Sequence, residues 1–124
     1  MEHPAPPVTG YRPLPQEDID LMNAVKAKAA ELLALHDQIV ERAMIQSNQL
    51  WADQQNAETL LRAADQTGDA ESMAEAQAYS EAVSEKVNRW QRAEPMRWAA
   101  IGRTDIQQGV MALVRAVAQP DSVC

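Results

Sequence analysis

The sequence predicts an all-α fold, with long kinked helices and a helical-hairpin insertion, assembling as a homo-oligomer. Three observations predict helices rather than sheets. The 124 residues include 22 alanines and 12 glutamines but only four glycines and no phenylalanine. Apolar residues recur at three- and four-residue steps, as on one face of a helix. The β-branched residues, which favour strands, never gather in alternating runs.

Size and charge exclude several classes of protein. A chain of 124 residues is expected to form one folding unit, because a domain typically has roughly 100–200 residues. Eighteen acidic and eleven basic residues give a net charge of −7. This balance argues against binding of duplex DNA or of an anionic membrane through bulk charge, so an anionic ligand needs a local pocket. The single cysteine, Cys124, has no partner for an internal disulfide.

The chain divides into an arm and a helical domain. Four prolines within residues 1–13 hold this arm extended, because proline fixes φ and lacks an N–H. Residues 14–124 form the single helical domain. The start of the chain lacks the pattern of a signal peptide, and no apolar run approaches the roughly 20 residues that span a bilayer. We therefore expect a soluble, intracellular protein.

The first helix begins at Leu14-Pro15, because proline suits a first turn and acidic residues follow it. Neither Pro nor Gly occurs between Gln16 and Gln66, so this helix would extend about 75 Å. Either it bends in the polar segments 46–49 or 54–56, or a partner subunit covers its apolar stripe. Both alternatives favour an assembly. The stripe contains Ile19, Met22, Val25, Ala29, Leu32, Leu33, Ile39, Val40 and Met44.

Thr67-Gly68-Asp69 predicts the turn of a helical hairpin. Gly68 can end a helix in the left-handed conformation, and Asp69 can cap the next helix. The apolar stripe of the return helix is expected to pack against the first helix, where it would meet Leu50, Trp51, Leu60 and Leu61. That stripe contains Met73, Ala76, Tyr79 or Ser80, Val83, Val87 and Trp90.

Glu94-Pro95 interrupts the helical pattern, since proline cannot continue a helix without losing a backbone hydrogen bond. A last helix then runs from Met96 to Ala118, before Pro120. Gly102 and Gly109 lie on nearly the same face of it. Because glycine costs about 1 kcal/mol relative to alanine inside a helix, the pair suggests close approach of another backbone or a ligand. The apolar stripe contains Trp98, Ile101, Ile106, Val110, Leu113 and Val117.

Enzyme signatures are nearly absent from the chain. The two histidines, His3 and His36, form no HExxH motif or Cys/His cluster, and there is no glycine-rich phosphate loop. We predict no catalytic residue, metal site or cofactor. The side chains that suit recognition of an anion are cations and aromatics near helix ends, since tyrosine stacks on bases and Lys or Arg binds phosphate. They are Tyr11, Arg12, Lys26, Lys28, Arg97, Trp98, Arg103 and Thr104. The plainer interpretation is that these are ordinary surface residues.

Three segments, in order, resemble the phage anti-CBASS protein 2 family: YRPL, LMNAVKAKAAEL and RWAAIGRTDIQQGVMALVRAVAQP. The resemblance covers roughly residues 10 to 45 and 94 to 120. Members of the family are small helical proteins that assemble into homohexamers and sequester the cyclic oligonucleotide messengers of bacterial CBASS immunity without degrading them. Compact members have a shorter middle, so residues 47–93 are interpreted as a hairpin insertion.

The resemblance implies a sponge in the host cytoplasm rather than an enzyme. The implied ligands are cyclic oligonucleotides such as 3′,3′-cGAMP and cyclic tri-AMP. The implied protein partners are further copies of the same chain. Carried over by position, Tyr11 would stack on a base and Lys26 would neutralise a phosphate in a cyclic dinucleotide pocket, with the arm as a lid. Arg97 and Thr104 would bind cyclic trinucleotides in separate three-fold pockets.

Three alternatives stay open. The stripes could serve only oligomer packing, in a helical assembly protein without a small ligand. The same anion-binding logic fits a sponge for another signalling nucleotide. An enzyme that cleaves such messengers is the weakest alternative, because the sequence offers no general base, nucleophile or metal set.

Overall fold

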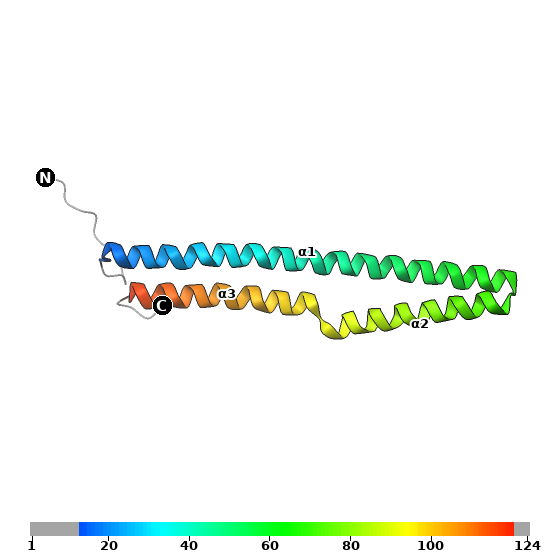
Figure 1. Ribbon diagram of the computed structural model, residues 1–124. Helices are drawn as coiled ribbons and strands as arrows, with labels where there is room; N and C mark the ends of the chain where they lie inside the picture. Colours follow the sequence, from blue (N-terminus) through cyan, green and yellow to red (C-terminus); the bar gives the residue numbers. More distant parts are fainter. Residues whose placement is uncertain (1–12, 121–124) are drawn as a thin grey trace. The chain divides into compact units, whose positions relative to one another are not determined.

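The computed structural model describes residues 13–120 and contains three helices. Helix α1 spans Gln16–Thr67, α2 spans Ala70–Ala93 and α3 spans Pro95–Ala118 (Figure 1). Residues 13–120 contain no strand, so the all-α prediction is confirmed. Among these residues, no helix combines the length and the apolarity that crossing a bilayer requires.

Helix α1 is continuous over 52 residues. The Pro15 carbonyl accepts hydrogen bonds from the Asp18 and Ile19 amides at 3.0 and 3.2 Å, which confirms the predicted start. Glu17 and Asp18 lie in the first turn, beside the positive end of the helix dipole. The helix runs through both polar segments, 46–49 and 54–56, without interruption.

The turn between α1 and α2 is the predicted one. Gly68 has a φ of 70°, and its amide donates to the Ala64 carbonyl at 3.1 Å. Asp69 caps α2: its Oδ1 accepts from the Glu71 amide at 3.3 Å, and its Oδ2 accepts from the Ser72 hydroxyl at 2.7 Å. These hydrogen bonds, that of Ser72 first, lower the pKa of the Asp69 carboxyl.

Glu94 separates α2 from α3. Its φ and ψ of 48° and 52° are left-handed, and its amide donates to the Trp90 carbonyl at 3.2 Å. Pro95 then opens α3, whose fourth residue, Trp98, donates its amide to the Glu94 carbonyl at 3.1 Å. The predicted interruption at Glu94-Pro95 is therefore confirmed as a single-residue break.

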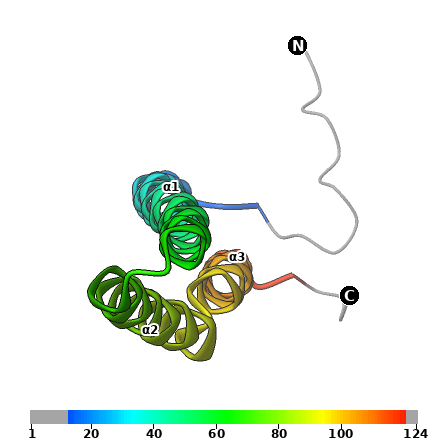
Figure 2. The same cartoon turned by 90° about the vertical axis from the view of Figure 1, so that its right-hand side faces the viewer.

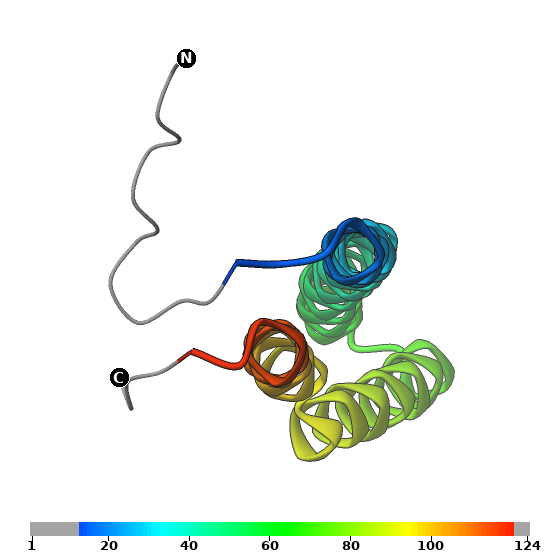
Figure 3. The same cartoon turned by 90° about the vertical axis from the view of Figure 1, so that its left-hand side faces the viewer.

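The chain forms two compact units, Asp37–Ala100 and the combination of Met1–His36 with Ile101–Cys124. We call them the hairpin unit and the end unit. In the hairpin unit, α2 runs back along the second half of α1 (Figures 1 and 2). In the end unit, the first turns of α1 lie beside the last turns of α3 (Figure 3).

Alanines form the core of the hairpin unit. Its buried residues are Ala43, Ala57, Ala64, Ala76 and Val83. Small side chains in a seam let two helix backbones come close, because interaxial distance follows the size of the side chains in contact. Larger neighbours are then displaced to the flanks. Of the four residues of the first helix expected to meet α2, Leu50 and Leu61 are half-buried. Leu60 is 48% exposed but lines a groove together with Ala76 of α2, and Trp51 is 65% exposed, so the expectation is wrong for Trp51.

The end unit buries even less. Ala118 is its buried apolar residue among those described, whereas Leu21, Leu32, Leu35, Met111 and Leu113 are exposed. The space beside both α3 glycines is open: a Cβ added at Gly102 or Gly109 would meet nothing within 4 Å. The close approach suggested for these glycines is therefore not made within the described part of this chain.

Candidate functional site

Two grooves lie between α1 and α3 in the end unit. The first has a volume of about 390 Å³, and we call it the cationic groove. It is lined by Lys26, Val110, Met111, Ala112, Val114, Arg115, Ala118 and Pro120. The second has a volume of about 490 Å³, and we call it the apolar groove. It is lined by Leu21, Ala24, Val25, Lys28, Ala29, Leu32, Asp105, Ile106, Gly109, Val110 and Leu113.

The two lysines of the first helix belong to different grooves. Lys26 lines the cationic groove and Lys28 the apolar groove. Residues two apart on a helix point about 200° away from each other, which explains the separation. The Lys28 Nζ also lies 3.4 Å from the Glu31 Oε2, and both side chains are largely exposed. The structure therefore distinguishes Lys26 from Lys28, which composition and spacing alone did not.

Arg115 is a groove-lining residue that the sequence analysis did not single out. It lies in the last turn of α3 and lines the cationic groove together with Lys26. The signal that points to it is positional: in an antiparallel arrangement, the end of the last helix meets the early turns of the first. Lys26 and Arg115 contribute the charge, and the remaining side chains of the groove are apolar.

Arg97 lies in the first turn of α3, in the hairpin unit. Its Nη1 donates to the Glu94 Oε2 at 2.9 Å, and its guanidinium carbon lies 5.9 Å from the centroid of the Trp98 ring. Thr104 follows seven residues later and is exposed. Seven residues rise about 10 Å along a helix and complete nearly two turns of it, so Arg97 and Thr104 lie on nearly the same face of α3.

The other members of the predicted set contribute less to a described site. Tyr11 and Arg12, like His3 and Cys124, lie outside the described residues. Arg103 is exposed on α3. His36 is half-buried on the face of α1 that carries the apolar stripe, as expected of a structural histidine. Among residues 13–120, no group of three or more His, Cys, Asp or Glu side chains could hold a metal ion.

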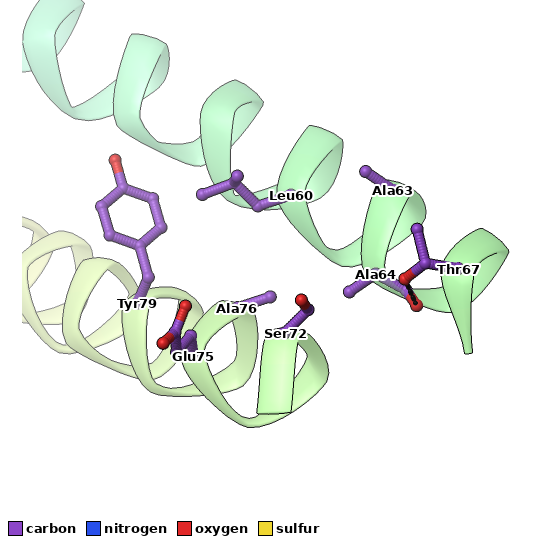
Figure 4. A pocket seen from close by; sticks show the side chains of 8 residues that line it. All are labelled: Leu60, Ala63, Ala64, Thr67, Ser72, Glu75, Ala76 and Tyr79. Atoms are coloured by element: carbon purple, nitrogen blue, oxygen red, sulfur yellow. Dashed lines mark hydrogen bonds between the residues drawn. The ribbon is translucent and has the colours of Figure 1, made fainter. Parts of the chain in front are cut away.

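A third groove, at the tip of the hairpin unit, has a volume of about 320 Å³. Tyr79 stands at one end of it and Thr67 at the other (Figure 4). Glu75 also lines it, and the surrounding residues 53–85 carry eight acidic side chains against one basic side chain, Arg62. This groove is therefore unsuited to an anion. Its full lining is Leu60, Ala63, Ala64, Thr67, Ser72, Glu75, Ala76 and Tyr79.

Comparison with known proteins identifies the family. The model of the Acb2/Tad1 hairpin domain matches residues 3–118. A curated protein of Pseudomonas phage JBD67, named Anti-CBASS protein 2, is 45% identical over 114 residues, which cover 92% of each chain. The chain belongs to the Acb2/Tad1 hairpin-domain family. The resemblance inferred from the three sequence segments is thereby confirmed.

The Acb2/Tad1 match extends well beyond those segments. It includes residues 47–93, which the sequence analysis left uncovered, and the alignment with the JBD67 protein covers as much of that protein as of this chain. The JBD67 relative is therefore of similar length. That residues 47–93 are an insertion relative to shorter members stays a prediction. The matched range also contains Tyr11, Lys26, Arg97, Thr104 and Arg115.

Proposed function

We propose that this protein is a phage anti-CBASS sponge that acts in the cytoplasm of the host cell. It binds cyclic dinucleotides at Tyr11 and Lys26 and cyclic trinucleotides at Arg97 and Thr104, and it releases both intact. By lowering the free concentration of the messenger, it keeps CBASS effectors inactive. The 45% identity to a protein named Anti-CBASS protein 2 supports the biological role.

The cationic groove is the observation that carries the proposed chemistry. Its volume of about 390 Å³ lies within the usual range of ligand pockets. Lys26 supplies a positive charge for a phosphate, and side chains such as Val110, Met111 and Val114 supply an apolar wall for a base or sugar. None of the described residues that line the groove is acidic.

Binding energy is the whole mechanism of a sponge. To compete with an effector, it must bind the messenger at least as tightly. A nanomolar dissociation constant corresponds to roughly −12 kcal/mol, which two charged contacts and two stacked bases can supply together with burial of the ligand. Tyr11 is the aromatic residue assigned to base stacking. In this proposal, the proline-rich arm that carries Tyr11 closes over the ligand. Proline already restricts the free chain, so closing costs little conformational entropy.

Self-association completes the proposal. The end unit exposes Leu21, Leu32 and Leu113 along the apolar groove, at 54%, 48% and 56%. A continuous apolar surface of this kind marks an interaction site, and a second copy of the chain is the partner that the homohexamer requires. A two-fold pair of chains would offer two Lys26 side chains to the two phosphates of a cyclic dinucleotide. A three-fold arrangement would offer three Arg97 side chains to a cyclic trinucleotide.

Isothermal titration calorimetry tests the proposal. Purified protein is titrated with 3′,3′-cGAMP and, separately, with cyclic tri-AMP, and the nucleotide is then recovered from denatured protein and chromatographed. We expect tight binding of both ligands and recovery of intact nucleotide, with stoichiometries that report two-fold and three-fold pockets. Recovery of linear nucleotide would contradict sequestration without cleavage.

A helical assembly protein without a small ligand is the second candidate. The exposed apolar side chains of the end unit favour it, because they demand a partner whether or not a nucleotide binds. In this case neither ligand produces heat, and Tyr11→Ala and Lys26→Ala leave the protein's assembly unchanged. A sponge for another nucleotide would likewise give no heat with these two ligands, but would bind a different cyclic nucleotide in the same titration.

A further inference from the structure

We infer that Arg115 is a second phosphate-binding residue of the cationic groove, which acts together with Lys26 on the cyclic dinucleotide. The inference rests on the proposed function and deepens it. The two residues come from different helices of the end unit, Lys26 from α1 and Arg115 from α3, and line the same groove. The sequence analysis gave no role to Arg115.

Charge distinguishes this groove from the two others described. The apolar groove is lined by one cation, Lys28, and one carboxylate, Asp105, and the described lining of the tip groove includes Glu75 and no cation. Among the described residues that line these three grooves, only those of the cationic groove include two cations and no carboxylate. A phosphate group is an anion that both Lys and Arg bind.

The two cations are suited to different tasks. Lysine presents a compact charge on a flexible stem, whereas arginine presents a planar fork that can donate two hydrogen bonds to one phosphate. Arginine also stays protonated at any physiological pH. We therefore assign to Arg115 the orientation of the phosphate and to Lys26 mainly the neutralisation of its charge.

The end of α3 holds the backbone of Arg115 in place. The Arg115 carbonyl accepts a hydrogen bond from the Gln119 amide at 2.8 Å, and Gln119 has a left-handed φ of 47°. Ala118, the last residue of the helix, is buried with 3% exposure. A capped and anchored helix end limits the movement of the arginine stem, which reduces the entropy lost when the side chain binds a ligand.

A structural role for Arg115 is the competing interpretation, because a cation near a helix C-terminus interacts favourably with the helix dipole. The chain offers a matched control for this role. Arg92 lies in the last turn of α2, in the hairpin unit, and lines none of the three grooves. Arg92→Gln removes the same dipole interaction without touching the cationic groove.

The test measures the affinity for 3′,3′-cGAMP of the full-length wild-type protein and of Arg115→Gln, Lys26→Gln and Arg92→Gln. Melting temperature, oligomeric mass and the dependence of affinity on salt are recorded for each variant. We expect Arg115→Gln and Lys26→Gln each to weaken binding by about ten- to a hundredfold, as for loss of a hydrogen bond to a charged group. Both substitutions should also make the affinity less sensitive to salt, because fewer counterions are released when the nucleotide binds. Arg92→Gln should retain wild-type affinity.

Each other outcome has a distinct meaning. Wild-type affinity in Arg115→Gln, with weakened binding in Lys26→Gln, would overturn the inference and leave the proposed function standing. Absence of binding by the wild-type protein would overturn both. If Arg115→Gln does not fold, the Arg115→Lys variant tests the inference instead. Lysine retains the positive charge at the helix end but lacks the planar guanidinium that donates two hydrogen bonds. A severalfold loss of affinity in a folded Arg115→Lys variant supports the inference, and wild-type affinity contradicts it.

Discussion

Arg97 donates a hydrogen bond from Nη1 to the Glu94 Oε2 at 2.9 Å, across the start of α3. Both side chains are substantially exposed, at 66% and 45%, so the ion pair contributes at most about 1 kcal/mol. The pair nevertheless occupies a donor that the proposed three-fold pocket needs. In the proposed pocket, Glu94 would therefore compete with a phosphate for the same guanidinium.

We expect Glu94→Gln to raise the affinity for cyclic tri-AMP by up to about fivefold, since the competing charge is removed and its stabilisation is at most about 1 kcal/mol. Glu85→Gln is the matched control, because Glu85 is an exposed glutamate of α2 for which no contact with Arg97 is described. Titration calorimetry with both variants measures the difference. Equal affinities would argue against a role of Arg97 in binding this ligand.

Backbone conformation predicts opposite effects at the two ends of α2. Glu94 and Gly68 both have left-handed φ values, 48° and 70°. Glu94→Gly relieves the strain of a side chain in this region and should stabilise the protein by about 0.5–1 kcal/mol, whereas Gly68→Ala should destabilise it by about 1 kcal/mol. A Cβ at Gly68 meets nothing within 4 Å, so only the backbone conformation opposes it. Urea unfolding measures both changes, and a shift of the same sign in both variants would contradict this explanation.

The apolar groove should be required for assembly. Leu32 and Leu60 are equally exposed, at 48%, but Leu32 lines the apolar groove and Leu60 the tip groove. Leu32→Gln should therefore lower the mass of the assembly in light scattering after size-exclusion chromatography, and Leu60→Gln should leave it unchanged. Equal behaviour of the two variants would place the contact between copies elsewhere.

Acid should weaken the start of α2. Hydrogen bonds from the Ser72 hydroxyl and the Glu71 amide lower the pKa of Asp69. The folded state therefore favours the ionised carboxylate more than the unfolded chain does. This contribution is complete above the unfolded pKa of about 3.9 and is lost as pH falls through the lower pKa of the folded state. Asp69→Ala should unfold more easily than wild type at neutral pH, and the difference should vanish at strongly acidic pH. Denaturant titrations at several pH values, followed by circular dichroism, provide the measurement.

The two lysines of α1 should differ in their effect on nucleotide binding. Lys26 lines the cationic groove, whereas Lys28 lines the apolar groove and lies 3.4 Å from a Glu31 oxygen. Lys26→Ala should weaken binding of 3′,3′-cGAMP by about 2 kcal/mol, and Lys28→Ala should change it by less than about 0.5 kcal/mol. A larger loss in Lys28→Ala than in Lys26→Ala would exclude the cationic groove as the dinucleotide site.

The sequence predicted the helices and their ends because these depend on local chemistry. Pro15, Gly68 and Pro95 act through backbone sterics that no distant contact has to supply. Asp69 caps α2 through hydrogen bonds to residues two and three positions away. These four positions determine where each helix begins or ends, and they include the break between α2 and α3.

The seam and the full site could not be predicted in the same way. Apolar periodicity identified most of the half-buried positions, but Leu32, Ile39 and Met44 of the predicted stripe are exposed. The buried residues of the hairpin unit are mainly alanines, and Trp51 lies outside the seam. Arg115 approaches Lys26 only because of the register between α1 and α3, which no local pattern encodes. Tyr11 lies outside the described residues, so its predicted role stays a prediction.

The hairpin also has a consequence for the order in which the molecule folds. Ala64 and Ala76 line the tip groove together and lie close in the sequence, whereas Lys26 and Arg115 come from opposite ends of the chain. Closing a short loop takes less entropy than closing a long one. We therefore expect the turn at Gly68 to form early and the cationic groove to form last. During synthesis on the ribosome, the groove proposed as the nucleotide site could therefore form only after the last helix has been made.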